Sequence, residues 1–177
     1  GFVSPQSYRA DHMGPKVIQW LKDINVVEQF DLVQKGVAPK KDDRNNAIGE
    51  MLLSIDMVKA NYTALQVMAK KLMITIPDSW KDMCASLDIH PFLAGSKMFR
   101  QHAFGHHHPS AYVAVQRRII SNLKERLNIE DKDLVYLSHD ELVIRYPKDG
   151  IDGIHRRING IMGTSNPVQF WLTPYRV

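Results

Sequence analysis

Cysteine is nearly missing from this sequence. Cys84 is the single cysteine in 177 residues, which excludes an internal disulfide framework and a zinc site built from cysteines. Because Cys84 lies on an apolar helical stripe with no histidine beside it, we interpret it as a buried structural thiol. Residues 1–5 lack the features of a secretory signal. We therefore expect an intracellular protein in a reducing compartment.

Long hydrophobic runs and long runs of one charge are also missing. No apolar stretch approaches the roughly 20 residues of a membrane span, so we expect no membrane association. The formal charge of +4 and the absence of a long Lys/Arg run permit a polyanionic partner without requiring one. With 44% hydrophobic and 24% charged residues, the chain has the composition of one well-buried globular domain with a small appendage.

The N-terminal part of the chain carries an amphipathic pattern. Val17, Trp20, Leu21 and Ile24 recur at helical spacing after Gly14-Pro15, which predicts a helix with proline in its first turn. This apolar stripe must be buried, against the main domain or against a protein partner. Residues 39–46 contain no apolar side chain and mix both charges, so we interpret them as a surface loop. We accordingly divide the chain into an appendage with its linker at 1–46 and a main domain at 47–177.

The main domain alternates strand and helix patterns. Helices are expected at about 57–71, 78–87, 97–105, 109–127 and 151–162, and strands at 51–56, 134–137, 141–146 and 168–172. Without a helical insertion at about 73–132, the order is strand, helix, hairpin, helix, strand. This order predicts an α+β, ferredoxin-like (palm- or RRM-like) antiparallel sheet with helices on one face. Its last strand should lie at an edge, because Pro167 and Pro174 bracket it.

Two acidic residues interrupt the predicted hairpin. Asp140 and Glu141 stand between β-rich runs, although such residues are depleted from strands. An ordinary solvated turn is one explanation. The other depends on topology: the first strand of a ferredoxin-like sheet lies beside the third, so Asp56 at its end would approach Asp140. Converging carboxylates suit a pair of Mg²⁺ or Mn²⁺ ions for phosphoryl or nucleotidyl transfer, whereas unrelated strand ends would have no such role.

Three short motifs occur in the order found in the palm of template-dependent nucleic-acid polymerases. The segment 54–62, Ser-Ile-Asp-Met-Val-Lys-Ala-Asn-Tyr, is similar to the first palm motif of families A and B. The segment 97–105, Lys-Met-Phe-Arg-Gln-His-Ala-Phe-Gly, resembles the family B fingers motif. The segment 138–143, Ser-His-Asp-Glu-Leu-Val, resembles the third motif of family A. The resemblance covers about residues 50–177 and implies a polymerase-like, two-metal nucleotidyltransferase.

The resemblance assigns roles to individual residues. Asp56 and Asp140 would hold the metal ions, and Glu141 would assist them at the hairpin tip. Tyr62 would take the place of the aromatic steric gate, and Phe104 would contact the nucleotide from the fingers motif. Independently of the family, Lys97 and Arg100 are one helical turn apart and could hold a triphosphate, although a solvated basic helix face explains them equally well.

Further basic residues are candidates for contacts with a nucleic-acid backbone: Arg117, Arg118, Arg156 and Arg157. The run His106-His107-His108 invites a metal interpretation, but three successive side chains cannot easily converge on one ion. We therefore favour a polar loop there.

Three functions fit these patterns. The first is a polymerase-like nucleotidyltransferase that acts on nucleic acid and nucleoside triphosphates. The second is a non-catalytic palm- or RRM-like module that binds single-stranded nucleic acid or scaffolds a replication complex. The third is a metal-dependent phosphohydrolase with the same carboxylates.

Overall fold

The computed structural model describes residues 5–32, 36–163 and 166–177, with side chains from residue 13 onward. The predicted appendage at 1–46 includes residues 1–4 and 33–35, which lie outside this description. The chain forms two compact units, each made of two segments. The first unit contains residues 1–31 and 64–112, and the second contains residues 32–63 and 113–177. This division differs from the predicted one, because most of the predicted insertion belongs with the N-terminal helices.

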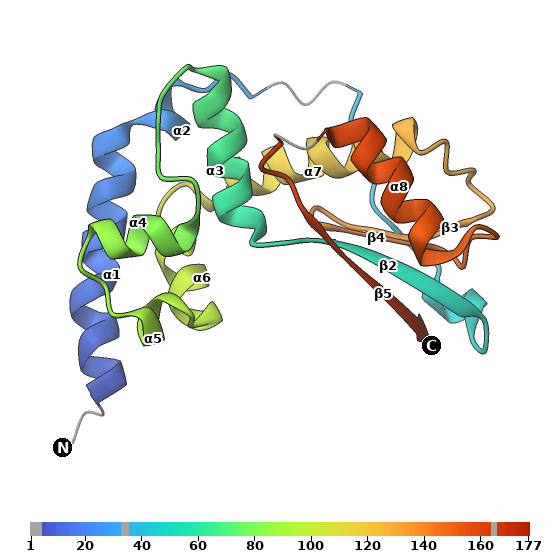
Figure 1. The fold of residues 1–177 in the computed structure, drawn as a ribbon, viewed down its shortest axis with the longest axis horizontal. Helices are drawn as coiled ribbons and strands as arrows, with labels where there is room; N and C mark the ends of the chain where they lie inside the picture. Colours follow the sequence, from blue (N-terminus) through green and yellow to red (C-terminus); the bar gives the residue numbers. More distant parts are fainter. Residues whose placement is uncertain (1–4, 33–35, 164–165) are drawn as a thin grey trace. The chain divides into compact units, whose positions relative to one another are not determined.

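The first unit is helical (Figure 1). Its elements are α1 (Pro5–Ile24), α2 (Val26–Gln29), the second part of α3 (Ala60–Lys71), α4 (Trp80–Ser86), α5 (Pro91–Ala94), α6 (Lys97–Gly105) and the start of α7 (Pro109–Arg126). Within it, α1 packs against α5 and α6. The predicted stripe is therefore buried inside the chain itself: Val17 and Leu21 have no exposed surface, and Trp20 and Ile24 are half-buried.

Aromatic rings fill the core of this unit. The Trp80 ring centroid lies 6.1 Å from that of Phe99 and 5.6 Å from that of Phe104, whose ring meets Tyr112 edge-on. The indole N–H of Trp80 donates to the carbonyl of Ala94 at 2.7 Å, so its polar atom is satisfied within the core. Ser79 caps α4, since its side chain accepts a hydrogen bond from the backbone N–H of Asp82.

Two local predictions in the N-terminal half were wrong. Helix α1 begins well before Gly14, so Pro15 lies in its interior, where a proline removes one helical hydrogen bond. Residues 39–46 are more than a loop, since Lys41–Asp42 forms the short strand β1 and Arg44–Ala47 forms the 3₁₀ helix η1. A two-residue strand is held by its neighbour in the sheet, so its own residues carry no hydrophobic alternation that would reveal it.

The second unit is an α+β structure with a five-stranded antiparallel sheet in the order β1-β3-β4-β2-β5. The remaining strands are β2 (Met51–Met57), β3 (Leu134–Leu137), β4 (Glu141–Arg145) and β5 (Phe170–Arg176), and the unit also contains α8 (Gly150–Met162). The expected pairing of the strand at 51–56 with the strand at 141–146 is confirmed. β5 lies at a sheet edge as predicted, but it starts later than expected and includes Pro174.

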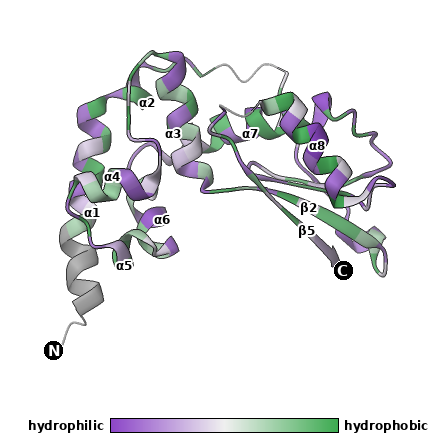
Figure 2. Cartoon of the chain, in the orientation of Figure 1, coloured by the Kyte–Doolittle hydropathy of each residue, from purple (hydrophilic) through white to green (hydrophobic). Residues whose placement is uncertain are grey.

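The amphipathic elements of this unit follow their sequence patterns. Figure 2 shows hydrophobic and hydrophilic stretches along α8, whose buried residues include Ile154 and Ile158. In α7, Val115, Ile120 and Leu123 are buried, whereas Ile119 is half-buried. On one sheet face, Leu52, Val135 and Val143 cluster with Ala47 of η1. This cluster anchors η1, and with it β1, to the sheet.

Candidate functional site

The predicted carboxylates lie together at one end of the two neighbouring strands β2 and β4. Asp56 pairs with Glu141 in the strand register, so the two side chains project from the same face of the sheet. The backbone N–H of Met57 donates to the carbonyl of Asp140 at 2.9 Å, which places the hairpin tip beside the end of β2. The predicted approach of these segments, 84 residues apart in sequence between Asp56 and Asp140, therefore follows from sheet pairing.

Ser138 organises the hairpin tip. Its backbone N–H donates to the Glu141 carbonyl at 2.9 Å, and its hydroxyl oxygen accepts from the Glu141 N–H at 3.2 Å. The same hydroxyl lies 3.3 Å from Asp140 Oδ1. His139 Nε2 approaches this oxygen at 3.6 Å. The tip is thus a compact turn in which Asp140 remains about one third exposed, so its carboxylate is held locally without being buried.

Glu141 is held from the neighbouring strand. The hydroxyl of Ser54, which is 6% exposed, donates to Glu141 Oε2 at 2.7 Å. Tyr175 on β5 lies within the field of this charge: burial first, and then the Glu141 carboxylate, raise the pKa of Tyr175. Sequence reasoning had not singled out Ser54, although strand alternation puts it on the same face as Asp56.

An open cavity of about 600 Å³ connects these groups. Its lining includes Asp56, Asp140 and Glu141 from the predicted site, together with Lys40 and Lys41 beside β1. The two lysines were missed, because their segment resembles an ordinary solvated charge run until β1 pairs with β3. Cations beside three carboxylates make the cavity suitable for a ligand that brings both negative charge and a metal ion, such as a phosphate ester.

Asp42 also lines the cavity, but its carboxylate is hydrogen-bonded to Arg44. The guanidinium donates from Nε to Asp42 Oδ1 at 2.9 Å and from Nη2 to Oδ2 at 2.8 Å. These hydrogen bonds lower the pKa of Asp42. Arg44 also lies over the ring of Tyr136, 4.2 Å from its centroid. Both carboxylate oxygens of Asp42 therefore accept hydrogen bonds from one neighbouring side chain.

The cavity lining includes carboxylate oxygens, the ligand type that a hard divalent cation prefers. Mg²⁺ takes oxygen ligands and is commonly held by one or two carboxylates, with water and substrate phosphates completing its shell. Asp56 and Asp140 offer such oxygens in one solvent-accessible cavity. The cavity therefore suits a cation that arrives with its substrate better than a closed cage of protein ligands.

The predicted nucleotide-binding residues belong to different surroundings. Tyr62 and Phe104 are 2% and 1% exposed, and the ring contacts of Phe104 give it a packing role in the first unit. Lys97 is exposed on α6, and burial lowers the pKa of the half-buried Arg100. Lys97, Arg100 and Phe104 belong to the first unit, and the carboxylate cavity to the second.

The predicted backbone-contacting arginines divide by their partners. Arg157 donates to Asp149 Oδ1 at 3.2 Å and to the Leu127 carbonyl at 3.5 Å, so it joins α8 to the end of α7. Arg156 is exposed on α8, whereas Arg117 and Arg118 are half-buried on α7. Sequence reasoning also missed Trp171, which is 64% exposed and pairs with Asp56 in the register of β2 and β5.

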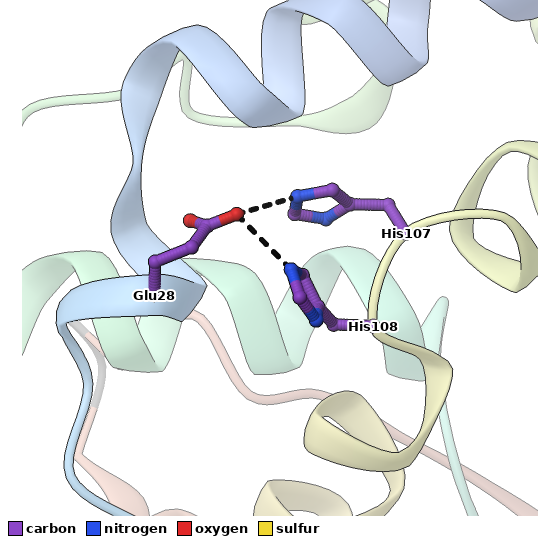
Figure 3. Close-up of side chains that lie close together, drawn as sticks. All are labelled: Glu28, His107 and His108. Carbon is purple, nitrogen blue, oxygen red and sulfur yellow. Dashed lines mark hydrogen bonds and ion pairs between the residues drawn. The ribbon is translucent and has the colours of Figure 1, made fainter.

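The histidine run forms a second polar cluster, in the first unit. Glu28 Oε1 lies 2.9 Å from His107 Nε2 and 3.3 Å from His108 Nε2 (Figure 3). Among the residues that the structure describes, these three are the group of His, Cys, Asp or Glu whose ligand atoms all lie within 4.8 Å of one another. Two of the three histidines meet a carboxylate from a distant segment, whereas the ring of His106 contacts that of His102.

Comparison of the chain with protein-family models, with curated proteins and with solved structures gives no match. Among the described residues, no helix has both the length and the apolar character needed to cross a membrane. The case for a function therefore depends on the geometry of the two clusters.

Proposed function

We propose that the chain is a nucleotidyltransferase with a polymerase-like palm, which adds nucleotides to a nucleic-acid 3′ end by a two-metal mechanism. The observation that carries the proposal is the convergence of Asp56, Asp140 and Glu141 in one cavity at the end of β2 and β4. The order β3-β4-β2-β5, with α3 after β2 and α8 after β4, is the arrangement of a ferredoxin-like palm and supports the same assignment.

Asp56 and Asp140 would hold Mg²⁺ or Mn²⁺. When bound, such ions lower the pKa of an attacking 3′-hydroxyl and stabilise the negative charge of the leaving pyrophosphate. Asp56 lies near the end of β2, and Asp140 lies in the turn before β4, where its carbonyl accepts from the Met57 N–H at 2.9 Å. Backbone hydrogen bonds therefore hold the two segments together before any ligand arrives. The proposed role of the sheet is thus to keep the two carboxylates near one another, because its backbone hydrogen bonds hold the segments that carry them.

The other residues of the cavity would position the substrate. Ser54 holds the Glu141 side chain through the 2.7 Å hydrogen bond, so Glu141 would stay beside the predicted metal ligands. Lys40 and Lys41, which also line the cavity, would offset the charge of the triphosphate. Lys97 and Arg100 of the first unit remain predicted triphosphate contacts.

Trp171 provides an observation in favour of the second candidate function, binding of single-stranded nucleic acid without catalysis. Its exposed ring lies on β5 opposite Asp56 in register, and exposed aromatic rings on a sheet are stacking platforms for bases. The central strands β2 and β4, however, end in carboxylates, which repel a phosphate backbone unless a cation is present. This composition favours catalysis.

Primer extension tests the proposal. Wild-type protein is incubated with primed DNA and RNA templates and each nucleotide set, in Mg²⁺ and in Mn²⁺, and Asp56→Asn and Asp140→Asn are run in parallel. Asp152→Asn, an exposed carboxylate on α8 outside the cavity lining, is the matched control. We expect template-copied products from the wild type and the control only.

Two other outcomes would replace the proposal. If the protein binds a nucleic-acid strand but does not extend a primer, and if Trp171→Ala weakens this binding, the non-catalytic binding module would be supported. Release of phosphate from nucleoside triphosphates without any primer, abolished in Asp56→Asn, would identify a metal-dependent phosphohydrolase.

A further inference from the structure

We propose that Glu28, His107 and His108 form a three-ligand zinc site, which ties the end of the α1–α2 segment to the connection between α6 and α7. Two imidazoles and one carboxylate are a ligand set that zinc uses in proteins with a fourth position left for water. The site lies in the first unit and is independent of the carboxylate cavity and of its proposed chemistry.

The ligand atoms already have nearly the spacing that zinc requires. Zn–N and Zn–O distances are about 2.1 Å, so two ligands at a tetrahedral angle lie about 3.4 Å apart. The observed separations from Glu28 Oε1 are 2.9 Å to His107 Nε2 and 3.3 Å to His108 Nε2. All three ligand atoms lie within 4.8 Å of one another, so an ion could enter between them after a small rearrangement of the side chains. In Figure 3 both imidazole nitrogens point toward the same carboxylate oxygen.

The backbone supplies the convergence that a plain run of three histidines lacks. His108 has a φ of 47°, in the left-handed region that non-glycine residues rarely adopt. This conformation occurs where the chain turns from α6 into α7, and it accompanies the meeting of two consecutive side chains on one carboxylate. A left-handed histidine costs conformational energy, and such costs concentrate at functional sites.

A hydrogen bond with Tyr112 orients the ring of His107, one of the proposed zinc ligands. His107 is 3% exposed, and its second ring nitrogen, Nδ1, lies 2.9 Å from the hydroxyl of Tyr112. Zinc-bound histidines regularly use their other nitrogen for a hydrogen bond that fixes the ring and its tautomer. A tyrosine hydroxyl can donate to Nδ1 or accept from it, so it serves His107 both with and without an ion.

The exposed side of the cluster leaves room for the remaining ligand. The side chains of Glu28 and His108 are 32% and 55% exposed, so water can reach the ion from solvent. The site joins segments 79 residues apart. Binding would therefore stabilise the folded first unit in proportion to the free zinc concentration.

The experiment measures Zn²⁺ affinity by calorimetry and Co²⁺ coordination by visible absorption, on the full chain. Glu28→Gln and His108→Asn remove one ligand each, and asparagine tolerates the left-handed backbone at 108. His106→Asn is the matched control from the same run, since its ring stacks on His102, with the centroids 4.1 Å apart. Tyr112→Phe tests the orienting contact.

We expect Glu28→Gln and His108→Asn to weaken Zn²⁺ binding by roughly tenfold or more, and Tyr112→Phe to weaken it by about tenfold. The wild type should show the intense absorption of tetrahedral Co²⁺, and Zn²⁺ should raise its melting temperature while Mg²⁺ does not. Affinity that survives both ligand variants but falls in His106→Asn would move the site to His102 and His106. That result, or no binding by a folded wild type, would overturn the proposal.

Discussion

The two clusters are built in opposite ways. The carboxylate cavity of the second unit depends on the hydrogen-bonded register of β2 and β4, in which Asp56 faces Glu141. The Glu28 cluster of the first unit depends on a turn with a left-handed residue, His108, and on the packing of α1 against α6. A sheet register fixes side-chain faces over many residues at once, whereas a turn fixes only its own few residues. The first kind of site is therefore readable from strand patterns, and the second is not.

The two clusters also differ in their ionisable residues. In the first unit, burial lowers the pKa of His107 despite its hydrogen bond to Glu28. For Glu28, burial acts to raise the pKa, but hydrogen bonds from its own backbone and from His107, together with the histidine charges, bring it below its ordinary value. In the second unit the acidic residues stand beside lysines, so the cavity suits an anionic ligand carried with a cation.

The largest expected effect concerns the acidic ligands of the cavity. Asp56→Asn and Asp140→Asn should each reduce nucleotide addition by at least about 1,000-fold, since metal-ion stabilisation of the transferred group would be lost. The fold should be unchanged or slightly more stable, because repulsion between neighbouring carboxylates is relieved. Primer extension and urea unfolding of the same preparations measure both quantities. Variants that are strongly destabilised would indicate that these residues hold the hairpin.

A core variant in the other unit should have a different signature. Phe104→Ala removes a buried ring that contacts Trp80 and Tyr112, and should cost about 3–5 kcal/mol of unfolding free energy. Hydrogen exchange should show the loss of protection mainly in α4 to α6, with β2 and β4 less affected. Equal loss in both units would show that they unfold as one. Unchanged stability together with weaker nucleotide binding would restore the role that the sequence motif implied.

A smaller effect is expected from the link between β2 and β4. Ser54→Ala removes the donor to Glu141 and should cost about 1–2 kcal/mol, since the bond ends on a charged acceptor. Thr173→Ala provides a control on β5, because Thr173 pairs with Ser54 in register but is exposed. Denaturant unfolding compares the two. An equal cost for both variants would mean that the Ser54 hydroxyl contributes no more than an exposed position does.

The smallest expected effect is at Asp42. Asp42→Asn breaks an exposed pair with Arg44, so the urea midpoint at neutral pH should hardly change. Because the pKa of Asp42 is lowered in the folded state, its contribution is present above its ordinary value of 3.8 and lost as the pH falls below it. Melting curves between about pH 7 and about pH 2 should differ slightly between wild type and variant above about pH 4, and the difference should disappear as the pH falls further. A large difference at neutral pH would make Asp42 a structural or metal-binding member of the cavity.

The central strands of the sheet could be predicted from the sequence, because the hydrophobic patterns of strands are local and repeated. The apolar runs at 51–57 and 134–145 gave the central strands, and the placement of Asp56 beside the hairpin followed from strand order alone. Serine caps and a proline start likewise located α4, α6 and α7. These helices and strands are favoured by their own residues, so they can be predicted without knowing which elements pack against them.

Other features depend on contacts with residues distant in sequence, which no local pattern indicates. Lys41 is part of a strand only because Leu137 lies beside it, so Lys40 and Lys41 could not be placed in the cavity. Pro15 argues against a helix interior, yet packing of α1 on α5 and α6 outweighs it. His107 and His108 meet Glu28 through a left-handed turn, which a histidine rarely adopts.

The central claim is that Asp56 and Asp140 bind a divalent cation in the cavity, and Mn²⁺ binding tests it most directly. Electron paramagnetic resonance measures free Mn²⁺ in titrations of the wild type, Asp56→Asn, Asp140→Asn and the control Asp152→Asn, each with and without a nucleoside triphosphate. We predict that the wild type and the control bind Mn²⁺ more tightly with the triphosphate, and that both cavity variants lose at least about 90% of this affinity, a cost of about 1.4 kcal/mol or more. Equal Mn²⁺ binding by all four folded proteins would contradict the account.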